Sequence, residues 1–272
     1  MEARYVSFGS VGNLETTRRV ARSGRVVLNG RVRFLVVADD PESCPYLPGR
    51  TMRLPLRMPL GKLGPEQFDR FLEEGDRRTG PLLYRPSCPA CHACEAIRVP
   101  VQRFAPTRSQ RRVWKRNEGE IEVIRTRPDV TAEHLALYNR HSRERALSLR
   151  EDLATERDYR FFLVETCVDT WEVQYRVNGR MIAVSILDFG RTSVSAVYHY
   201  FDPDVSWRSM GVYSVLKEIE LCADLGLEWY YLGLYVEDCR HLNYKATYWP
   251  HQRRRHGVWQ EFTRDENVTP GT

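Results

Sequence analysis

The sequence predicts an α+β fold with a mixed sheet flanked by helices, and adjoining stretches near residues 194–232 carry most of that prediction. In residues 194–200 an apolar or aromatic side chain falls at every second position, which is the period of a half-buried strand. Apolar residues then recur at the spacing of an amphipathic helix, with Ser209 as the N-cap and Gly226 after the end. Residues 228–232 form a second strand, and a right-handed crossover would place the two strands parallel in one sheet.

The turn into this helix has the sequence Arg-Ser-Met-Gly-Val-Tyr over residues 208–213. It resembles the R-x-x-G-x-G/A loop of the acyl-CoA N-acetyltransferase (GNAT) fold, where backbone N–H groups at a helix N-terminus hold a pyrophosphate. Tyr213 stands where that loop has a small residue, and its phenol would obstruct a pyrophosphate. The resemblance therefore implies an acetyltransferase-like fold with a donor other than acyl-CoA. An ordinary helix entry without a ligand is the alternative.

The composition indicates a globular protein without a membrane span. Of 272 residues, 42% are hydrophobic and 28% are charged, which fits one or two domains with a sizeable core. No apolar run approaches the ~20 residues of a membrane-spanning helix, and residues 1–23 lack the apolar stretch of a secretory signal. We therefore expect a cytoplasmic protein with no membrane partner.

The first half of the chain contains a polar extension followed by a hairpin. Residues 1–23 show little periodicity, so we expect a loosely ordered extension. In residues 25–37, β-branched runs flank Asn29-Gly30, the preferred pair for a type I′ turn. We assign residues 24–127 to an N-terminal cysteine-containing α+β domain, with a second acetyltransferase-like unit as an alternative for it.

The second half alternates helices and strands in a recognisable order. Thr131 is the N-cap of a helix over residues 132–146, and Thr155 begins a second helix with a capping box. Three antiparallel strands follow in residues 171–200. Together with the crossover, this is the element order of an acetyltransferase-like core, so we expect residues 128–272 to form a catalytic GNAT-like domain.

One stretch is basic without any acidic residue, although the net charge is only +5. The cations of residues 103–116 are Arg103, Arg108, Arg111, Arg112, Lys115 and Arg116. Trp114 lies among them, and a basic run with an interleaved aromatic residue is the pattern of a polyanion contact. A solvated linker is the alternative.

The seven cysteines are an odd number, which favours reduced thiols or a metal over a disulfide framework. Cys88, Cys91 and Cys94 have C-x2-C-x2-C spacing, and Cys44 or His92 would complete a four-ligand site for zinc or an iron–sulfur cluster. A reduced, partly buried cysteine cluster without metal is the alternative.

Four groups of residues, in this order, resemble the aminoacyl-tRNA–protein transferase family, which includes the arginyl- and leucyl-transferases of the N-degron pathway. They are Cys44-Pro-Tyr-Leu-Pro48; Tyr84-Arg-Pro-Ser-Cys88 with Cys91 and Cys94; residues 104–116; and Tyr200-Phe-Asp-Pro-Asp204 through Gly211 to Tyr231-Leu-Gly233 and Tyr244-Lys-Ala246. The match covers about residues 33–262 and is most similar to the bacterial aspartate/glutamate leucyltransferases. The lead-in before Cys44 is longer than usual, and Leu234 replaces an aromatic residue.

The resemblance implies transfer of an amino acid from aminoacyl-tRNA to the N-terminal α-amine of proteins that begin with Asp or Glu, which marks them for degradation. Leucine is the favoured amino acid and arginine the alternative, because no single residue identifies the pocket. The reaction is aminolysis of an activated ester, so it requires no cofactor. An acyl-CoA-dependent N-acetyltransferase and a metal-containing nucleic-acid-binding module without catalysis are the competing hypotheses.

This chemistry needs a group to take the ammonium proton and a donor to the oxyanion or the leaving ribose oxygen. We predict Asp202 as the base or as the group that orients the amine, with Tyr198 and Tyr244 as donors. A structural Asp-Pro turn and core tyrosines are the alternative for these residues.

Two sets of cations complete the predicted site. Arg77, Arg78, Arg85 and Lys245 are candidates to bind the acidic side chain of the acceptor. Arg111, Arg112, Lys115 and Arg116 are candidates to bind tRNA phosphates. For each residue, a surface position or a structural ion pair is the alternative.

Overall fold

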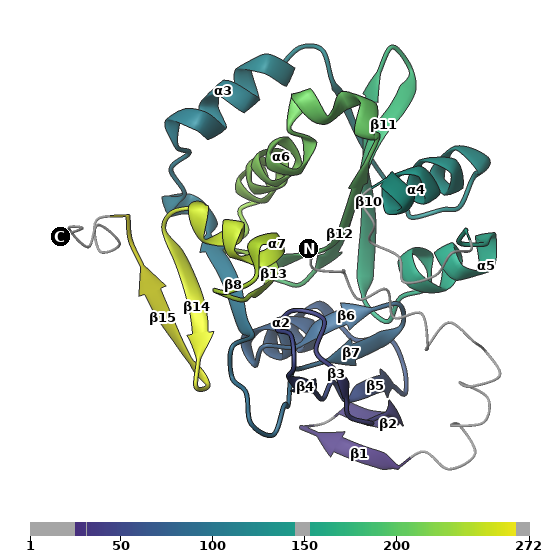
Figure 1. Ribbon diagram of the computed structural model, residues 1–272, viewed down its shortest axis with the longest axis vertical. Helices are drawn as coiled ribbons and strands as arrows, with labels where there is room; N and C mark the ends of the chain where they lie inside the picture. Colours follow the sequence, from purple (N-terminus) through teal and green to yellow (C-terminus); the bar gives the residue numbers. More distant parts are fainter. Residues whose placement is uncertain (1–24, 31, 145–152, 265–272) are drawn as a thin grey trace.

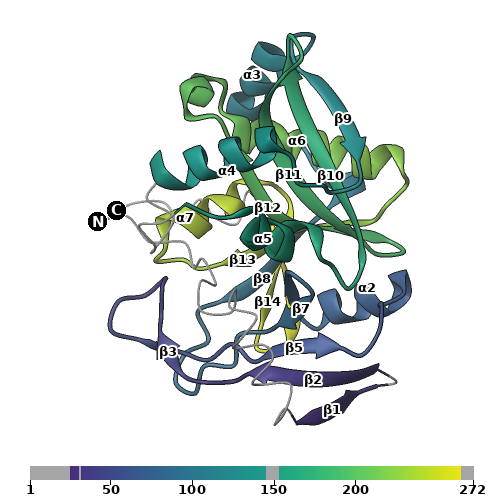
Figure 2. The same cartoon turned by 90° about the vertical axis from the view of Figure 1, so that its right-hand side faces the viewer.

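The computed structural model describes residues 25–30, 32–144 and 153–264, so the expected extension at residues 1–23 lies outside the described residues. The described chain forms a large sheet with helices on both faces and a smaller sheet below it (Figures 1 and 2). No helix in this part of the chain is long and apolar enough to cross a membrane.

The larger sheet has eight strands in the order β15-β14-β8-β13-β12-β11-β10-β9. They are β8 (Glu95–Pro100), β9 (Glu122–Thr126), β10 (Asp169–Val177), β11 (Arg180–Phe189), β12 (Ser193–Phe201), β13 (Trp229–Tyr235), β14 (His251–Arg255) and β15 (Val258–Phe262). Every neighbouring pair is antiparallel except β12 and β13, which are parallel and joined by α6 (Met210–Asp224). The predicted crossover and the acetyltransferase-like α+β fold are therefore confirmed.

β12 and β13 diverge soon after they begin. Their ladder joins residues 193–195 to residues 229–231, whereas β12 continues to Phe201 and β13 to Tyr235. Val197 is an extra residue opposite β11, and Leu232 is an extra residue opposite β8. Such bulges bend a strand, so the carboxyl-terminal ends of β12 and β13 separate and present their backbone groups to other elements.

The smaller sheet is antiparallel, in the order β1-β2-β5-β7-β6. It contains β1 (Val26–Asn29), β2 (Val32–Ala38), β5 (Leu56–Pro59), β6 (Arg77–Thr79) and β7 (Leu82–Tyr84), and β3 (Glu42–Ser43) pairs with β4 (Thr51–Met52) beside it. The hairpin predicted around Asn29-Gly30 is confirmed, with Gly30 at a φ of +59°. Within residues 25–30 and 32–84, every strand pair of this sheet is antiparallel, so this part of the chain has no counterpart of the parallel crossover.

One hydrophobic core joins the two sheets. Phe68, Phe71 and Leu72 of α2 (Pro65–Glu73) pack with strand residues of the smaller sheet and with Tyr231 of β13. Because Tyr231 belongs to the larger sheet, this core fixes the smaller unit against β13.

Helices cover both faces of the larger sheet (Figure 1). α3 (Arg108–Asn117) and α6 lie on one face, and α4 (Ala132–Glu144) and α5 (Glu156–Tyr159) lie on the other. The shorter helical segments are η1 (Val101–Arg103), η2 (Arg160–Val164), η3 (Pro203–Arg208), α7 (Arg240–Asn243) and η4 (Tyr244–Thr247). The capping box predicted at Thr155 is confirmed.

Three features differ from the sequence-based expectations. β8 and β9 belong to the larger sheet, so the expected boundary at residue 127 falls inside that sheet. The basic run contains α3, whose capping box joins Thr107 and Gln110. Ser209 precedes α6 in a left-handed conformation, and its side chain makes no capping hydrogen bond, because η3 occupies the stretch expected to be an open loop.

Candidate active site

The turn that begins α6 does not have the geometry of a simple phosphate loop. Tyr213 is buried, and its ring lies 6.0 Å from that of Trp114 and 6.2 Å from that of Tyr175. Burial raises the pKa of Tyr213 to about 12. Tyr213 therefore fixes α6 to α3 and to the sheet.

Asp202 lies at the end of β12, where η3 begins, and its carboxylate is fully engaged. Oδ1 lies 3.0 Å from Nη1 of Arg140 and accepts a hydrogen bond from the backbone N–H of Asp204, while Oδ2 pairs with Arg180. A proton on this carboxylate would weaken two ion pairs. The geometry therefore favours a structural role for Asp202 over the predicted role of base.

The two predicted tyrosine donors lie on different elements. Tyr198 is buried in an aromatic cluster, with its hydroxyl bonded to that of Tyr138 and its ring 5.1 Å from Phe162. Tyr244 begins η4 and is 44% exposed. Tyr244 is thus the more accessible of the two residues.

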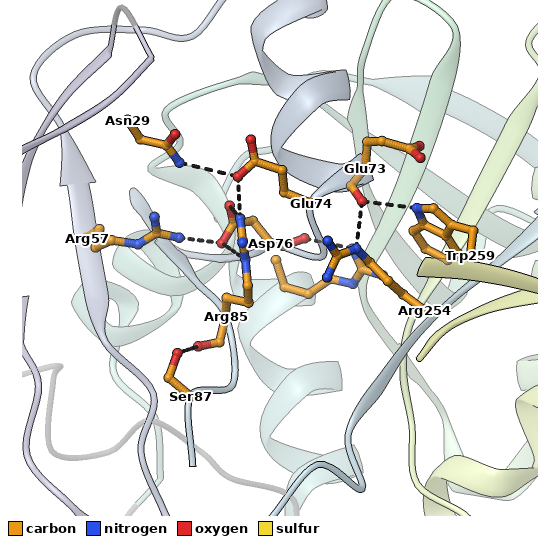
Figure 3. Close-up of polar contacts among 10 residues, drawn as sticks. Asn29, Arg57, Glu73, Glu74, Asp76, Arg85, Ser87, Arg254 and Trp259 are labelled. Atoms are coloured by element: carbon orange, nitrogen blue, oxygen red, sulfur yellow. Dashed lines mark hydrogen bonds and ion pairs between the residues drawn. The ribbon is translucent and has the colours of Figure 1, made fainter. Parts of the chain in front are cut away.

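Two of the four predicted acceptor cations already have carboxylate partners. Arg78 donates to Oδ2 of Asp188 at 2.5 Å, and neither side chain is accessible to solvent. Arg85 donates to Asp76 at 2.7 Å and to Glu74 at 2.6 Å, and Arg57 binds the same Asp76 (Figure 3). These arginines stabilise the smaller sheet and its contact with the larger one, so the prediction that they bind substrate is not supported by their geometry.

The other two predicted cations, Arg77 and Lys245, converge on the end of β13. Arg77 donates to the carbonyl of Gly233 at 2.9 Å, and Lys245 donates to the carbonyl of Leu234 at 2.8 Å. Burial, and then the charge of Arg77, lowers the pKa of Lys245 to about 7. Burial also lowers the pKa of Arg77. The structure therefore brings together a β6 residue and an η4 residue that are far apart in the sequence.

The predicted tRNA cations all lie exposed on α3. Arg111, Arg112, Lys115 and Arg116 point to solvent in a helix whose buried residues are Gln110 and Asn117. Arg116 donates to the carbonyl of Trp207 in η3. Trp207 is 56% exposed, and the guanidinium carbon of Arg208 lies 4.3 Å from the centroid of its ring. Sequence inspection missed Trp207 as part of this surface, although it precedes Arg208 in the turn already singled out.

The four predicted metal ligands line one cavity of about 130 Å³, together with His92 and His256. Burial, and then the neighbouring thiols Cys44, Cys88 and Cys91, raises the pKa of Cys94 to about 12. Backbone N–H groups donate to the sulfurs of Cys44 and Cys88 at 3.4 Å. Even so, no three His, Cys, Asp or Glu side chains among the described residues are placed to hold a metal ion.

A buried carboxyl on α6 was also missed by sequence inspection. Glu218 accepts hydrogen bonds from the hydroxyls of Tyr175 and Tyr230, and burial raises its pKa to about 7. The signal was available, because Glu218 lies three residues after Val215 and four before Cys222, on the apolar face of the helix.

Comparison with known proteins identifies the family of this chain. The family model for the arginine-tRNA-protein transferase C terminus matches residues 133–255, and the model for the N terminus matches residues 42–112. The chain belongs to the arginine-tRNA-protein transferase family. As a member of this transferase family it is an enzyme, and the resemblance noted in the sequence is confirmed.

Curated relatives of this transferase match over most of their length. An aspartate/glutamate leucyltransferase from Chromobacterium violaceum is 37% identical over 226 residues, which cover 82% of this chain and 92% of the relative. One from Pseudomonas paraeruginosa is 36% identical, with 80% and 92% covered.

A solved structure supports the fold. The C-terminal domain of a protein described as a lysylphosphatidylglycerol synthetase from Agrobacterium fabrum has a TM-score of 0.50 and 12% identity, with 92% and 90% of the two chains covered. At this identity the likeness concerns the fold of the transferase alone.

Proposed function

We propose that this enzyme transfers leucine from leucyl-tRNA to the N-terminal α-amine of proteins that begin with Asp or Glu. The observation that carries the proposal is the match, over most of both chains, to relatives named for this activity. The exposed cations of α3 and the buried cations at the end of β13 are consistent with an RNA donor and an acidic acceptor.

The reaction forms an amide bond and breaks an ester bond. The neutral acceptor amine attacks the carbonyl carbon of the leucyl ester, the bond from that carbon to the ribose oxygen breaks, and the proton lost by the amine is returned to the ribose oxygen. An α-amine has a pKa of about 7.7–8.0, so a useful fraction is neutral near pH 7. Positioning of the two substrates can therefore supply much of the rate acceleration.

For proton transfer we favour Tyr244 as the donor to the ribose oxygen, with Tyr198 as the second candidate. Tyr244 is exposed and directly precedes Lys245 in η4, whereas Tyr198 is buried in an aromatic cluster. Asp202 acts on this site indirectly, because its ion pairs with Arg140 and Arg180 hold the end of β12.

For tRNA binding we propose the surface formed by Arg111, Arg112, Lys115, Arg116 and Trp207. The cations supply affinity for phosphates, and an exposed indole beside them offers a ring on which an unpaired base can stack. The link between Arg116 and the Trp207 carbonyl makes the two parts continuous.

The proposed aminolysis needs no cofactor, and zinc or an iron–sulfur cluster at Cys44, Cys88, Cys91 and Cys94 stays a separate proposal. Its support is that the four thiols line one cavity and that backbone N–H groups donate to two of them. Metal content of the purified protein, measured before and after treatment with a chelator, tests it. A cytoplasmic location, where aminoacyl-tRNA is available to the ribosome, also stays a prediction.

The second candidate is transfer of arginine, which the name of the matched family model favours. A transfer assay at low salt distinguishes the two candidates. The protein is mixed with leucyl-tRNA or arginyl-tRNA, labelled in the amino acid, and with peptides that begin with Asp, Glu or Ala.

We expect label from leucyl-tRNA to enter the Asp and Glu peptides and not the Ala peptide. Label from arginyl-tRNA alone would establish the second candidate. Failure of both tRNAs with folded, reduced protein would overturn the proposal, and acetyl-CoA would then be the donor to test.

A further inference from the structure

The end of β13 is held by two cations that come from different parts of the chain. Arg77 of β6 donates to the carbonyl of Gly233, and Lys245 of η4 donates to the carbonyl of the next residue, Leu234. A Cβ on Gly233 would lie 3.4 Å from Nζ of Lys245, so Gly233 leaves the ammonium uncovered on that side. The two side chains are thus directed at the same short segment of backbone.

Neither cation has a carboxylate partner among the described residues. Arg77 donates only to backbone carbonyls, those of Asp76 and Gly233, and its Nε is buried with no hydrogen-bond partner. The carboxylate of Asp76 is already bound by Arg57 and Arg85, and that of Asp188 by Arg78. The charge of Asp76 acts on the neighbouring Arg77, but the carboxylate oxygens of Asp76 are paired with Arg57 and Arg85.

Such a pair is costly unless it serves a ligand. Arg77 is 4% exposed and Lys245 is 9% exposed, and a buried charge without a counter-charge destabilises the folded state. The two positive charges also repel each other, which contributes to the lowered pKa of Lys245. Backbone carbonyls are neutral dipoles and cannot offset two like charges.

The pair has hydrogen-bond donors to spare. An ammonium has three N–H groups and a guanidinium has five. The structure gives Lys245 one acceptor, and it leaves Nε of Arg77 without any. A ligand that brought two oxygens and one negative charge would use these donors and neutralise the site.

The position of the pair fits a substrate of the proposed reaction. It lies where β13 has separated from β12, and Lys245 directly follows Tyr244, our candidate proton donor. A carboxylate held here would place its own backbone amine near the ends of both strands.

We propose that Arg77 and Lys245 bind the side-chain carboxylate of the first residue of the acceptor protein, and so determine its specificity for Asp and Glu. This inference rests on the proposed function. It narrows the four candidate cations to the two that no protein carboxylate has already neutralised.

The test compares acidic acceptors with their neutral isosteres. Arg77→Gln and Lys245→Gln are assayed with peptides that begin with Asp or Asn, using leucyl-tRNA. Lys62→Gln serves as a control because Lys62 is an exposed cation outside the pair. Each variant should lower kcat/KM for the Asp peptide by about 10- to 100-fold, the value of a charge-assisted hydrogen bond, and leave the Asn peptide unchanged. The ratio of the two substrates should then approach one.

A structural role predicts a different result. If the cations only support the bulge in β13, both peptides should lose activity equally, and the selectivity ratio should be unchanged. An unchanged selectivity ratio would therefore overturn the inference. Arg77→Lys keeps the charge and should retain most of the selectivity, which guards against loss of folding in the glutamine variants.

Binding of the Asp peptide without tRNA provides a second readout. Calorimetry should show weaker binding by about the same factor in Arg77→Gln and Lys245→Gln, and no change in Lys62→Gln. Unchanged binding in the folded variants would also overturn the inference. Transfer by the wild-type protein with no effect of the variants would leave the proposed function standing, whereas no transfer by the wild type would overturn that function itself.

Discussion

Arg77 and Arg78 are neighbours on β6, yet the protein treats their charges in opposite ways. Arg78 donates to Asp188, 110 residues away in sequence, and Thr170 and Gly80 complete the contacts of this buried pair. Arg77 donates hydrogen bonds only to backbone carbonyls, and its guanidinium carbon lies 5.3 Å from the centroid of the Tyr231 ring. A buried arginine with a carboxylate partner contributes to the fold, whereas one without such a partner is better explained by a ligand.

Other buried groups extend the comparison. Asp76 forms ion pairs with Arg57 and Arg85 (Figure 3). Like Arg78, these arginines have a carboxylate partner within the protein. Glu218 has hydroxyl partners and no cation partner among the described residues, and burial raises its pKa to about 7, so it titrates near neutral pH. These buried groups differ in whether an opposite charge, a backbone carbonyl or a hydroxyl is their partner. Each kind of partner should contribute differently to the free energy of unfolding, which can be measured.

The largest expected effect is the loss of the Arg78–Asp188 pair. Asp188→Asn should lower the free energy of unfolding by about 3–5 kcal/mol, because it leaves a buried guanidinium without its counter-charge. Urea denaturation followed by circular dichroism measures this. Arg77→Gln is the matched control and should leave the free energy of unfolding unchanged or raise it, since it removes no ion pair and takes away a buried charge without a carboxylate partner. An equal decrease in the free energy of unfolding for both variants would contradict the contrast drawn between Arg77 and Arg78.

Glu218 gives the next largest effect, through its dependence on pH. Its pKa is raised from 4.5 to about 7 in the folded protein, so the folded state binds the extra proton between these values. Stability should therefore fall as pH rises from 5 to 8, by about 2–3 kcal/mol from this group. The titrating groups around it, Tyr175, Tyr230 and Cys222, have pKa values raised above their usual range and remain neutral there.

Glu218→Gln isolates this contribution. Thermal unfolding at pH 5, 6, 7 and 8 should show a smaller fall for the variant than for the wild type, because glutamine does not ionise. The same pH dependence in both proteins would show that another group is responsible.

The sequence predicted the elements whose pattern is local. The hairpin at Asn29-Gly30 and the parallel crossover follow from turn chemistry and from the periods of strands and helices, which neighbouring residues determine. The place of β8 between β13 and β14 could not be predicted, because periodicity identifies a strand and not its partners. α3 was missed because its outer face is almost wholly charged, although Thr107 and Gln110 formed a capping signal.

The sequence predicted which residue types would form the candidate site, but it did not predict the role of each residue. Motif positions selected Arg77, Arg78, Arg85 and Lys245 together, since each is a cation in a suggestive place. Only the fold separates them, because Asp76 and Asp188 reach two of the four and leave the others without a carboxylate. For Asp202 the sequence suggested a free carboxylate, because its partners Arg140 and Arg180 could not be identified before the fold was known.

A smaller effect should have the opposite sign to the first. Lys245→Met should raise the free energy of unfolding by about 1–2 kcal/mol at pH 6, where the wild-type ammonium is charged and buried without a carboxylate. The pKa of Lys245 is lowered from 10.5 to about 7, so this penalty should shrink as pH rises from 7 to 10. Arg77 and Cys239 are the groups whose charges act on it. Chemical denaturation at pH 6 and pH 9 measures the difference, and destabilisation at pH 6 would indicate that Lys245 supports the fold instead.

The smallest effect on stability belongs to the exposed cations of α3, which separate affinity from folding. Arg112→Gln with Lys115→Gln should change the free energy of unfolding by about 0.5 kcal/mol or less, since both side chains point to solvent. The same double variant should weaken tRNA binding and reduce the slope of log K against log salt by about 1.5, if each cation contacts one phosphate. Filter binding at several salt concentrations measures the slope, with Arg33→Gln plus Lys62→Gln as an equally discharged control. A control that lost as much slope would show that net charge alone attracts the tRNA. An unchanged slope in the α3 variant would show that the tRNA binds another face of the protein. The exposed cations of α3 would then be solvated surface residues without a role in binding tRNA.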